Sequence, residues 1–116
     1  MPLLKLETTV ALSDEDKRKS LLAALSKAVA GAIGKPEQYV MVSISHPDIA
    51  MSGKPGNAAF VDIRSIGGLS GDVNRKLSQQ VCKLLTDSLG TPPERVYLNF
   101  TDMEAGNWGW NGSTFG

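Results

Sequence analysis

Pro2 is the residue whose type and position most directly suggest chemistry, because it follows Met1 in the opening segment MPLLKLETTV. If Met1 is removed, the proline nitrogen becomes a secondary amine at the chain terminus. Such an amine serves as a general base once its pKa lies close to the working pH. A structural role is the alternative, since proline has no N–H group to give a sheet and can therefore begin a strand.

Two other residues of reactive type, Cys82 and His46, each occur as the single example in the chain. One cysteine excludes an intrachain disulfide and a cysteine metal cluster, and one histidine excludes a multi-histidine metal site. Cys82 lies on the apolar stripe of a predicted helix, where we expect a small buried hydrophobe, and His46 lies in a predicted loop. The sequence therefore does not favour a Cys–His nucleophile pair.

The length of 116 residues predicts a single domain over 1–116. The chain has 12 Lys and Arg residues against 12 Asp and Glu residues, a balance that argues against a nucleic-acid or anionic-membrane surface. No segment approaches the ~20 apolar residues of a membrane span. The N-terminus lacks the basic segment and apolar core of a secretory signal, so we expect a cytoplasmic location.

The elements that would position these residues form two β-α-β units. In the first unit, alternation predicts a strand over Pro2–Val10. Apolar residues at helical spacing then predict a helix that begins at a Ser13 or Asp14 cap and ends at Gly34. The segment YVMVSIS, at 39–45, predicts the second strand.

The second half of the chain repeats this order. We predict a strand over 58–66, a helix over Asp72–Leu89 and a strand over 95–100. The related triplets PEQ at 36–38 and PER at 93–95 each lead from a helix end into a strand. Because each unit crosses over between parallel strands, the sequence predicts a two-layer α+β fold with a four-stranded mixed sheet and both helices on one face.

The sheet face opposite the helices is predicted to mix charged and large apolar side chains. They are Lys5, Glu7, Tyr39, Met41, Phe60, Asp62, Arg64, Tyr97 and Asn99. The C-terminal segment NWGWNGSTFG adds two tryptophans and a phenylalanine that it is too short to bury. Exposed apolar groups of this kind mark contacts with partners or ligands, so we expect a homo-oligomer.

Five short motifs together resemble the macrophage migration inhibitory factor family of the tautomerase superfamily. In order, they are MP, GKP, SIG, VYLNF and GWNGSTFG, and they extend over essentially the whole chain. The resemblance implies a homotrimer with an active site at each subunit boundary. It also implies a keto–enol tautomerase for arylpyruvates such as phenylpyruvate, with dopachrome-type compounds as a further substrate class.

The matching positions imply a set of site residues. Pro2 would be the catalytic base, and Lys35 would attract the substrate carboxylate. The implied substrate-binding residues beside Lys35 are Ile66, whose backbone would lie near the substrate, Tyr97 and Asn99 of the neighbouring subunit, and Trp110 and Phe115 of an aromatic wall. Burial in this pocket and the charge of Lys35 would both lower the pKa of the Pro2 amine. A proton shift needs neither a cofactor nor a metal, so none is expected.

Most of these residues also have an ordinary structural interpretation. Lys35 is a cation at a helix C-terminus, where the helix dipole favours positive charge. Tyr97 and Asn99 are outward residues of a predicted strand, and Trp110 could anchor an interface without touching substrate.

The chain departs from the family pattern in three places. Some members carry a C-x-x-C pair at the start of the third strand, where this chain reads GNAAFVDI, so thiol–disulfide activity is not expected. The loop over 46–57 differs from the usual glycine-rich version, which often holds an aromatic residue. Trp108 stands where relatives often have a smaller apolar residue. Both differences would change the pocket and its substrate preference.

Two further functions compete with the enzyme. One is a cytokine-like receptor-binding protein, as some animal members are, which would be released without a signal peptide and keep a vestigial tautomerase site. The other is a purely structural trimer. The joint presence of Pro2, Lys35 and Asn99 favours the enzyme, because a vestigial site has no chemical reason to keep all three.

Overall fold

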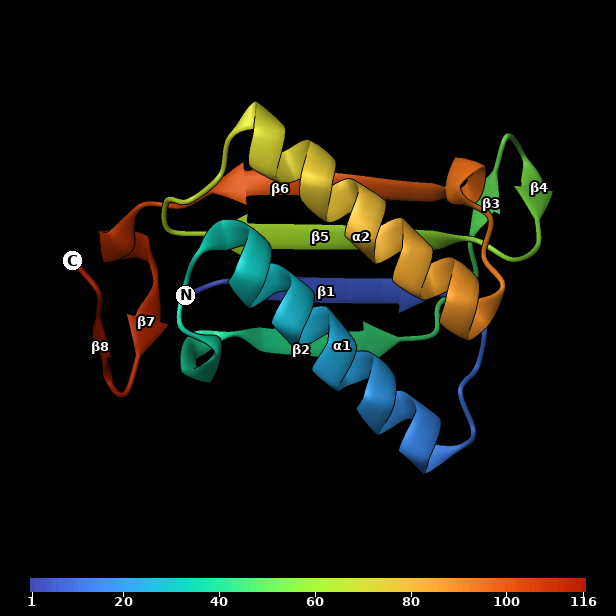
Figure 1. Cartoon of the computed structure of the whole chain (residues 1–116), viewed down its shortest axis with the longest axis horizontal. Helices are drawn as coiled ribbons and strands as arrows, with labels where there is room; N and C mark the ends of the chain where they lie inside the picture. The colour runs from blue at the N-terminus through green and yellow to red at the C-terminus, as the bar shows by residue number, and fades with distance from the viewer.

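A four-stranded sheet with both helices on one face forms the body of the protein, in a computed structural model that describes residues 1–116 (Figure 1). The strands are β1 (Leu3–Thr8), β2 (Met41–Ser45), β5 (Ala59–Ser65) and β6 (Val96–Asp102), in the order β2-β1-β5-β6. Strand β1 pairs parallel with β2, and β5 pairs parallel with β6, whereas β1 and β5 are antiparallel. The predicted mixed sheet and two-layer α+β arrangement are confirmed.

Both helices begin and end at local signals in the sequence. Helix α1 (Glu15–Ile33) has Asp14 as its N-cap, whose side chain accepts hydrogen bonds from two backbone N–H groups of the first turn. Helix α2 (Gly71–Leu89) has Ser70 as its N-cap, whose hydroxyl oxygen accepts one hydrogen bond, from the Val73 N–H group. A glycine in the left-handed conformation follows each helix and stops it. Neither helix is long and apolar enough to cross a membrane.

The hydrophobic core lies between the helices and the two central strands. Its best-buried side chains are Leu4, Leu6, Leu25, Val29, Val61, Ile63, Leu77, Val81 and Leu85. The inward residues of β2 and β6, such as Val42 and Leu98, are only partly buried, because these strands form the edges of the sheet. The central strands β1 and β5 are therefore fixed most firmly, and Pro2 directly precedes β1.

The internal repeat is visible in the connections from helix to strand. Each is a single 3₁₀ turn, η1 (Glu37–Tyr39) or η2 (Pro93–Arg95). Pro36 precedes the first turn and Pro92 the second, so these two prolines are equivalent. The predicted match of PEQ with PER is thus displaced by one residue. The physical reason is that Pro93 occupies the first position of its turn, where no N–H group is needed.

The loop over 46–57 contains a short hairpin that sequence reasoning did not predict. Strands β3 (Ala50–Met51) and β4 (Lys54–Pro55) are joined by Ser52 and Gly53, which both have positive φ angles of 57° and 71°. Positive φ at both central positions is the conformation of a type I′ turn. This hairpin lies at one end of the sheet, while the N-terminus and a second, C-terminal hairpin lie at the other (Figure 1).

Candidate active site

A cavity of about 220 Å³ lies at the end of the sheet where β1 begins. Three segments line it: the first residues of the chain, the connection into β2, and the C-terminal segment. Its lining residues are Met1, Pro2, Leu3, Gln38, Tyr39, Val40, Met41, Trp108, Gly109, Trp110 and Phe115. The structure therefore brings three of the proposed site residues, Pro2, Trp110 and Phe115, to one cavity.

The C-terminal hairpin holds the aromatic residues in place. Strands β7 (Gly109–Trp110) and β8 (Ser113–Thr114) are joined by Asn111 and Gly112, at φ angles of 52° and 79°. Asn-Gly is a favoured pair for this type I′ turn, because both residues tolerate positive φ. The Phe115 N–H group also donates a hydrogen bond of 3.1 Å to the Trp108 carbonyl, which closes the hairpin at its base.

Three aromatic rings meet over the cavity. Trp110 stacks on Phe115 with ring centroids 5.8 Å apart and planes inclined by 13°. Tyr39 contacts Trp110 edge-on, at 5.8 Å and 83°. Sequence reasoning placed Tyr39 on the outward face of a strand and missed it as a site residue, whereas the structure places it in the turn η1. The resulting flat, apolar wall suits a planar ring, which stacks or packs edge-on against aromatic groups.

The environment at the start of β1 disfavours a positively charged amine. With Met1 in place, the Pro2 nitrogen is an amide and the terminal ammonium belongs to Met1. Burial, and after it the positive charge of Lys35, lowers the pKa of that ammonium below its ordinary value of 8.0. The Pro2 side chain is fully buried, and its carbonyl accepts a 3.0 Å hydrogen bond from the Met41 N–H group. Position 2 is therefore firmly held.

Lys35 reaches this region from the end of α1. It follows Gly34, and its backbone N–H group donates a 3.2 Å hydrogen bond to the Ala30 carbonyl in the last turn. Its side chain is half-buried and packs near Gly68, where an added Cβ atom would lie 3.5 Å from the Lys35 Cε atom. That Cβ atom would also lie only 2.6 Å from Cγ2 of Ile33. Glycine at this position thus allows the loop after β5 to approach the end of α1.

That loop carries Ile66, which is half-buried. The Ser65 hydroxyl donates to the Gly67 carbonyl at 2.7 Å, and the Gly67 N–H group donates to an Asp102 carboxylate oxygen at 2.9 Å. The Met103 N–H group donates to the Ser65 carbonyl at 2.8 Å. Lys35 and Ile66 therefore belong to one anchored region at the end of the sheet that holds Pro2, although neither lines the cavity itself.

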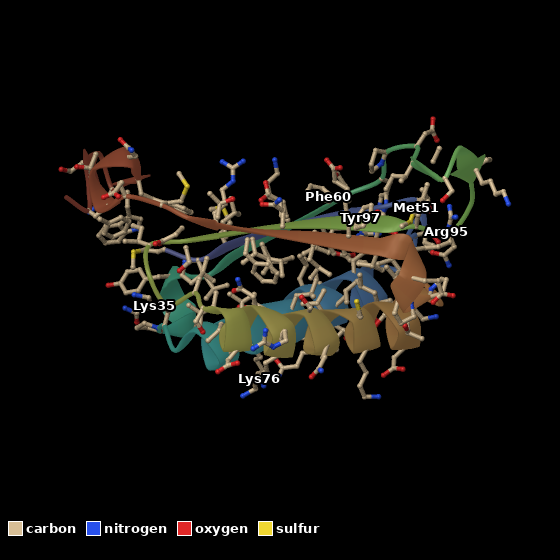
Figure 2. All side chains as sticks on the ribbon, turned by 90° about the horizontal axis from the view of Figure 1, so that it is seen from above. Lys35, Met51, Phe60, Lys76, Arg95 and Tyr97 are labelled. Atoms are coloured by element: carbon tan, nitrogen blue, oxygen red, sulfur yellow. The ribbon has the colours of Figure 1, made fainter.

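Tyr97 and Asn99 lie away from this cavity within one chain. The register of the sheet places Leu3 beside Arg64 and Arg64 beside Thr101. At about 3.3 Å per residue and about 4.8 Å per strand, the Cα atom of Asn99 lies roughly 12 Å from that of Leu3, and the Cα atom of Tyr97 roughly 16 Å. Figure 2 shows Lys35 towards one end of the molecule and Tyr97 well away from it, beyond the middle of the sheet. The structure of the single chain does not bring these two residues to Pro2.

Tyr97 instead lines a separate cavity, of about 240 Å³, at the far end of the sheet. Met51, Phe60 and Arg95 contribute to it and surround Tyr97 in Figure 2. The Arg95 side chain donates hydrogen bonds of 2.9 Å to the Asn57 carbonyl and 3.0 Å to the Lys54 carbonyl, which tie the β3–β4 hairpin to the sheet. The side chain of Tyr97 is 67% exposed in the single chain.

The other reactive side chains form no second centre. Cys82 is half-buried, and burial raises the pKa of its thiol, which disfavours the nucleophilic thiolate. His46 is exposed. No group of three or more His, Cys, Asp and Glu side chains comes together in a way that could hold a metal ion.

Comparison with known proteins gives a consistent relationship over the whole chain. The sequence profile described as "Macrophage migration inhibitory factor (MIF)" matches residues 1–116. A macrophage migration inhibitory factor of Meriones unguiculatus is 42% identical over 117 residues, which cover 99% of each chain. A homolog from Trichuris trichiura is 41% identical over 116 residues, 99% of this chain and 100% of that protein.

The fold is also similar to that of solved macrophage migration inhibitory factor structures. The structure of the macrophage migration inhibitory factor of Toxoplasma gondii superposes with a TM-score of 0.93 at 32% identity, over 97% of this chain and 99% of that one. This structure agrees with the mixed sheet and paired helices described above, and the family profile and the two relatives match the same chain over essentially its full length. The chain belongs to the macrophage migration inhibitory factor family.

Proposed function

We propose that the protein is a keto–enol tautomerase for arylpyruvates such as phenylpyruvate, with the Pro2 amine as general base after removal of Met1. The observation that carries this proposal is the environment at the start of β1. There, position 2 lines an aromatic-walled cavity, and burial and Lys35 together lower the pKa of a terminal amine. A neutral amine in a cavity shaped for a ring is what proton removal from an arylpyruvate requires.

The reaction moves one proton without changing the composition of the substrate. The Pro2 amine removes a proton from the carbon next to the keto group, and the electron pair of that C–H bond forms the carbon–carbon double bond of the enol. Negative charge then develops on the former keto oxygen, which receives the proton back. The cationic Lys35 side chain attracts the substrate carboxylate and favours the charge that develops nearby. A positioned base of this kind contributes about 10²–10⁴-fold to the rate.

The proposed active unit is a homotrimer in which Tyr97 and Asn99 complete the cavity of a neighbouring subunit. Support comes from large apolar groups that the single chain leaves exposed. Met41 and Tyr97 on the outer face of the sheet are each 67% exposed, and Trp110 in the C-terminal hairpin is 55% exposed. Large apolar groups on a single chain mark a contact surface. The distance between Tyr97 and Pro2 within one chain also supports an oligomer, because Tyr97 could meet a Pro2 only if that proline belonged to a second copy of the chain.

The test is the rate of phenylpyruvate tautomerisation, measured on protein whose mass shows that Met1 has been removed. Inserting one alanine between Met1 and Pro2 keeps the proline but makes its nitrogen an amide, which is not basic. We expect this variant to lose about 10²-fold or more in kcat/KM, because the proline amine is absent and the terminal amine is displaced by one residue. Pro47→Ala, in a distant loop, serves as the control and should keep the activity. Equal rates for the inserted variant and the unmodified chain would overturn the proposal.

A further inference from the structure

A cavity of about 240 Å³, which we call the second cavity, adjoins the one at Pro2 and is distinct from the one that Tyr97 lines. Its lining residues are Leu3, Arg64, Met103, Asn107, Trp108 and Gly109. Three of them, Leu3, Trp108 and Gly109, also line the cavity that holds Pro2. The two cavities therefore share a wall, and a molecule that lies across this wall could occupy both.

Trp108 is the largest residue of the shared wall, and its backbone is fixed at two points. Its N–H group donates a 3.2 Å hydrogen bond to the Ala105 carbonyl, and its own carbonyl accepts the 3.1 Å hydrogen bond from Phe115. Its side chain is half-buried. The wall is thus a rigid, apolar surface over which an aromatic ring can extend.

The second cavity differs from the first in its chemistry, because it contains a guanidinium group. Arg64 lies directly beside Leu3 in the antiparallel register of β1 and β5, where facing Cβ atoms are about 5 Å apart. Its Nη2 atom donates to Asp62 at 3.2 Å, which leaves other N–H donors of the fork for a ligand. Asn107 adds an amide to the same cavity. A planar, charged fork of this kind favours a carboxylate.

We propose that this second cavity is a subsite for an additional acidic group, so that the preferred substrates are arylpyruvates whose ring carries a second carboxylate. The proposal rests on the function proposed for the first cavity. The keto-acid end lies at Pro2 and Lys35, the ring passes along Trp108, and the distal carboxylate meets Arg64. Arg64 is then a specificity-determining residue, and Trp108 sets the direction of the ring.

The kinetic test compares kcat/KM for 4-carboxyphenylpyruvate with kcat/KM for phenylpyruvate. We expect the unmodified protein to prefer the carboxylated substrate and Arg64→Gln to reduce this preference by about tenfold. A tenfold effect is at the lower end of the range for a charge-assisted hydrogen bond. We expect this lower value because the Arg64 side chain is 45% exposed and water weakens the interaction. Arg75→Gln is the matched control, since Arg75 also pairs with an aspartate, Asp72, but on the outside of α2. It should leave the preference unchanged.

Asp62→Asn provides a test in the opposite direction. This substitution removes the carboxylate that competes for Arg64, so the preference for the carboxylated substrate should increase. A damaged fold would not produce such an increase. A preference that is absent in the unmodified protein, or that neither substitution changes, would overturn the subsite.

A binding measurement separates this proposal from the proposed function. The probes are 3-phenylpropanoate and 3-(4-carboxyphenyl)propanoate, which lack the keto group and cannot react, and binding is followed by the NMR signal of the Trp108 indole N–H group. If the dicarboxylate binds more tightly than 3-phenylpropanoate, and this difference depends on Arg64, the subsite is supported. If the same protein does not turn over phenylpyruvate, the tautomerase is refuted while the subsite stands. Turnover of phenylpyruvate with no difference between the two probes would refute the subsite alone.

Discussion

Gly68 allows the loop that carries Ile66 to lie against the end of α1, and its replacement tests whether this contact organises the site. An alanine Cβ atom at position 68 would lie 2.6 Å from Cγ2 of Ile33 and 2.9 Å from the Ile33 carbonyl oxygen. The carbonyl belongs to the backbone and cannot rotate away, so the loop itself must move. Since Lys35 packs near the same point, the movement would shift the loop relative to the lysine.

The neighbouring glycine supplies a matched control. Gly67 and Gly68 have similar φ angles of 73° and 80°, but an added Cβ atom at Gly67 meets nothing within 4 Å. Alanine at either position costs about 1 kcal/mol for the left-handed conformation. Alanine at position 68 adds overpacking of about 1–3 kcal/mol. We therefore expect Gly67→Ala to lower the free energy of unfolding by about 1 kcal/mol and Gly68→Ala to lower it by about 2–4 kcal/mol.

The assay is urea unfolding at one fixed protein concentration, combined with steady-state kinetics of phenylpyruvate tautomerisation. A higher KM is expected for Gly68→Ala than for Gly67→Ala, because displacement of the loop alters the surroundings of Lys35. Equal losses of stability in the two variants would show that the contact between Gly68 and Ile33 does not hold the loop. Equal KM values would show that the loop does not organise the site.

Three other predictions concern the residues around the cavity. Lys35→Gln removes one of the two causes that lower the pKa of the terminal amine, so that pKa should rise. Because activity is lost as pH falls through this pKa, the acid limb of the kcat/KM profile for phenylpyruvate should move to higher pH. An acid limb that stays in place would contradict this. Trp110→Ala should lower kcat/KM for phenylpyruvate by about tenfold through lost ring contacts, while a substrate without a ring should be less affected. Co-expression of Pro2→Gly and Tyr97→Ala chains should restore part of the activity that each lacks alone, because a mixed trimer contains a boundary with both native residues; no recovery would refute a shared site.

The helices and central strands could be predicted from sequence because their signals are local. Asp14 and Gly34 lie at the ends of α1 where the capping rules place them, and strict alternation marks β1 and β5. The hairpin in 46–57 could not be predicted in this way. Its strands have two residues each, too few to show alternation, and Ser52 is an uncommon residue at positive φ.

The candidate site was only partly accessible from sequence. Pro2 and the aromatic residues of the C-terminal segment could be brought together because motifs of the family mark both. Tyr39 was missed, since a strand pattern continues through it and only the turn η1 directs its ring towards Trp110. Tyr97 and Asn99 lie away from Pro2 within one chain, and their part in the site belongs to the proposed trimer, whose packing the residue pattern of one chain does not encode locally.

NMR titration of protein labelled with ¹⁵N-proline shows directly whether a neutral Pro2 amine is the base. We predict that Met1 is absent, that the Pro2 amine titrates below the pKa of an unperturbed proline amine, and that this pKa coincides with the acid limb of the kcat/KM profile for phenylpyruvate. Full activity in protein that retains Met1, or a Pro2 pKa equal to that of an unperturbed proline amine, would contradict this prediction.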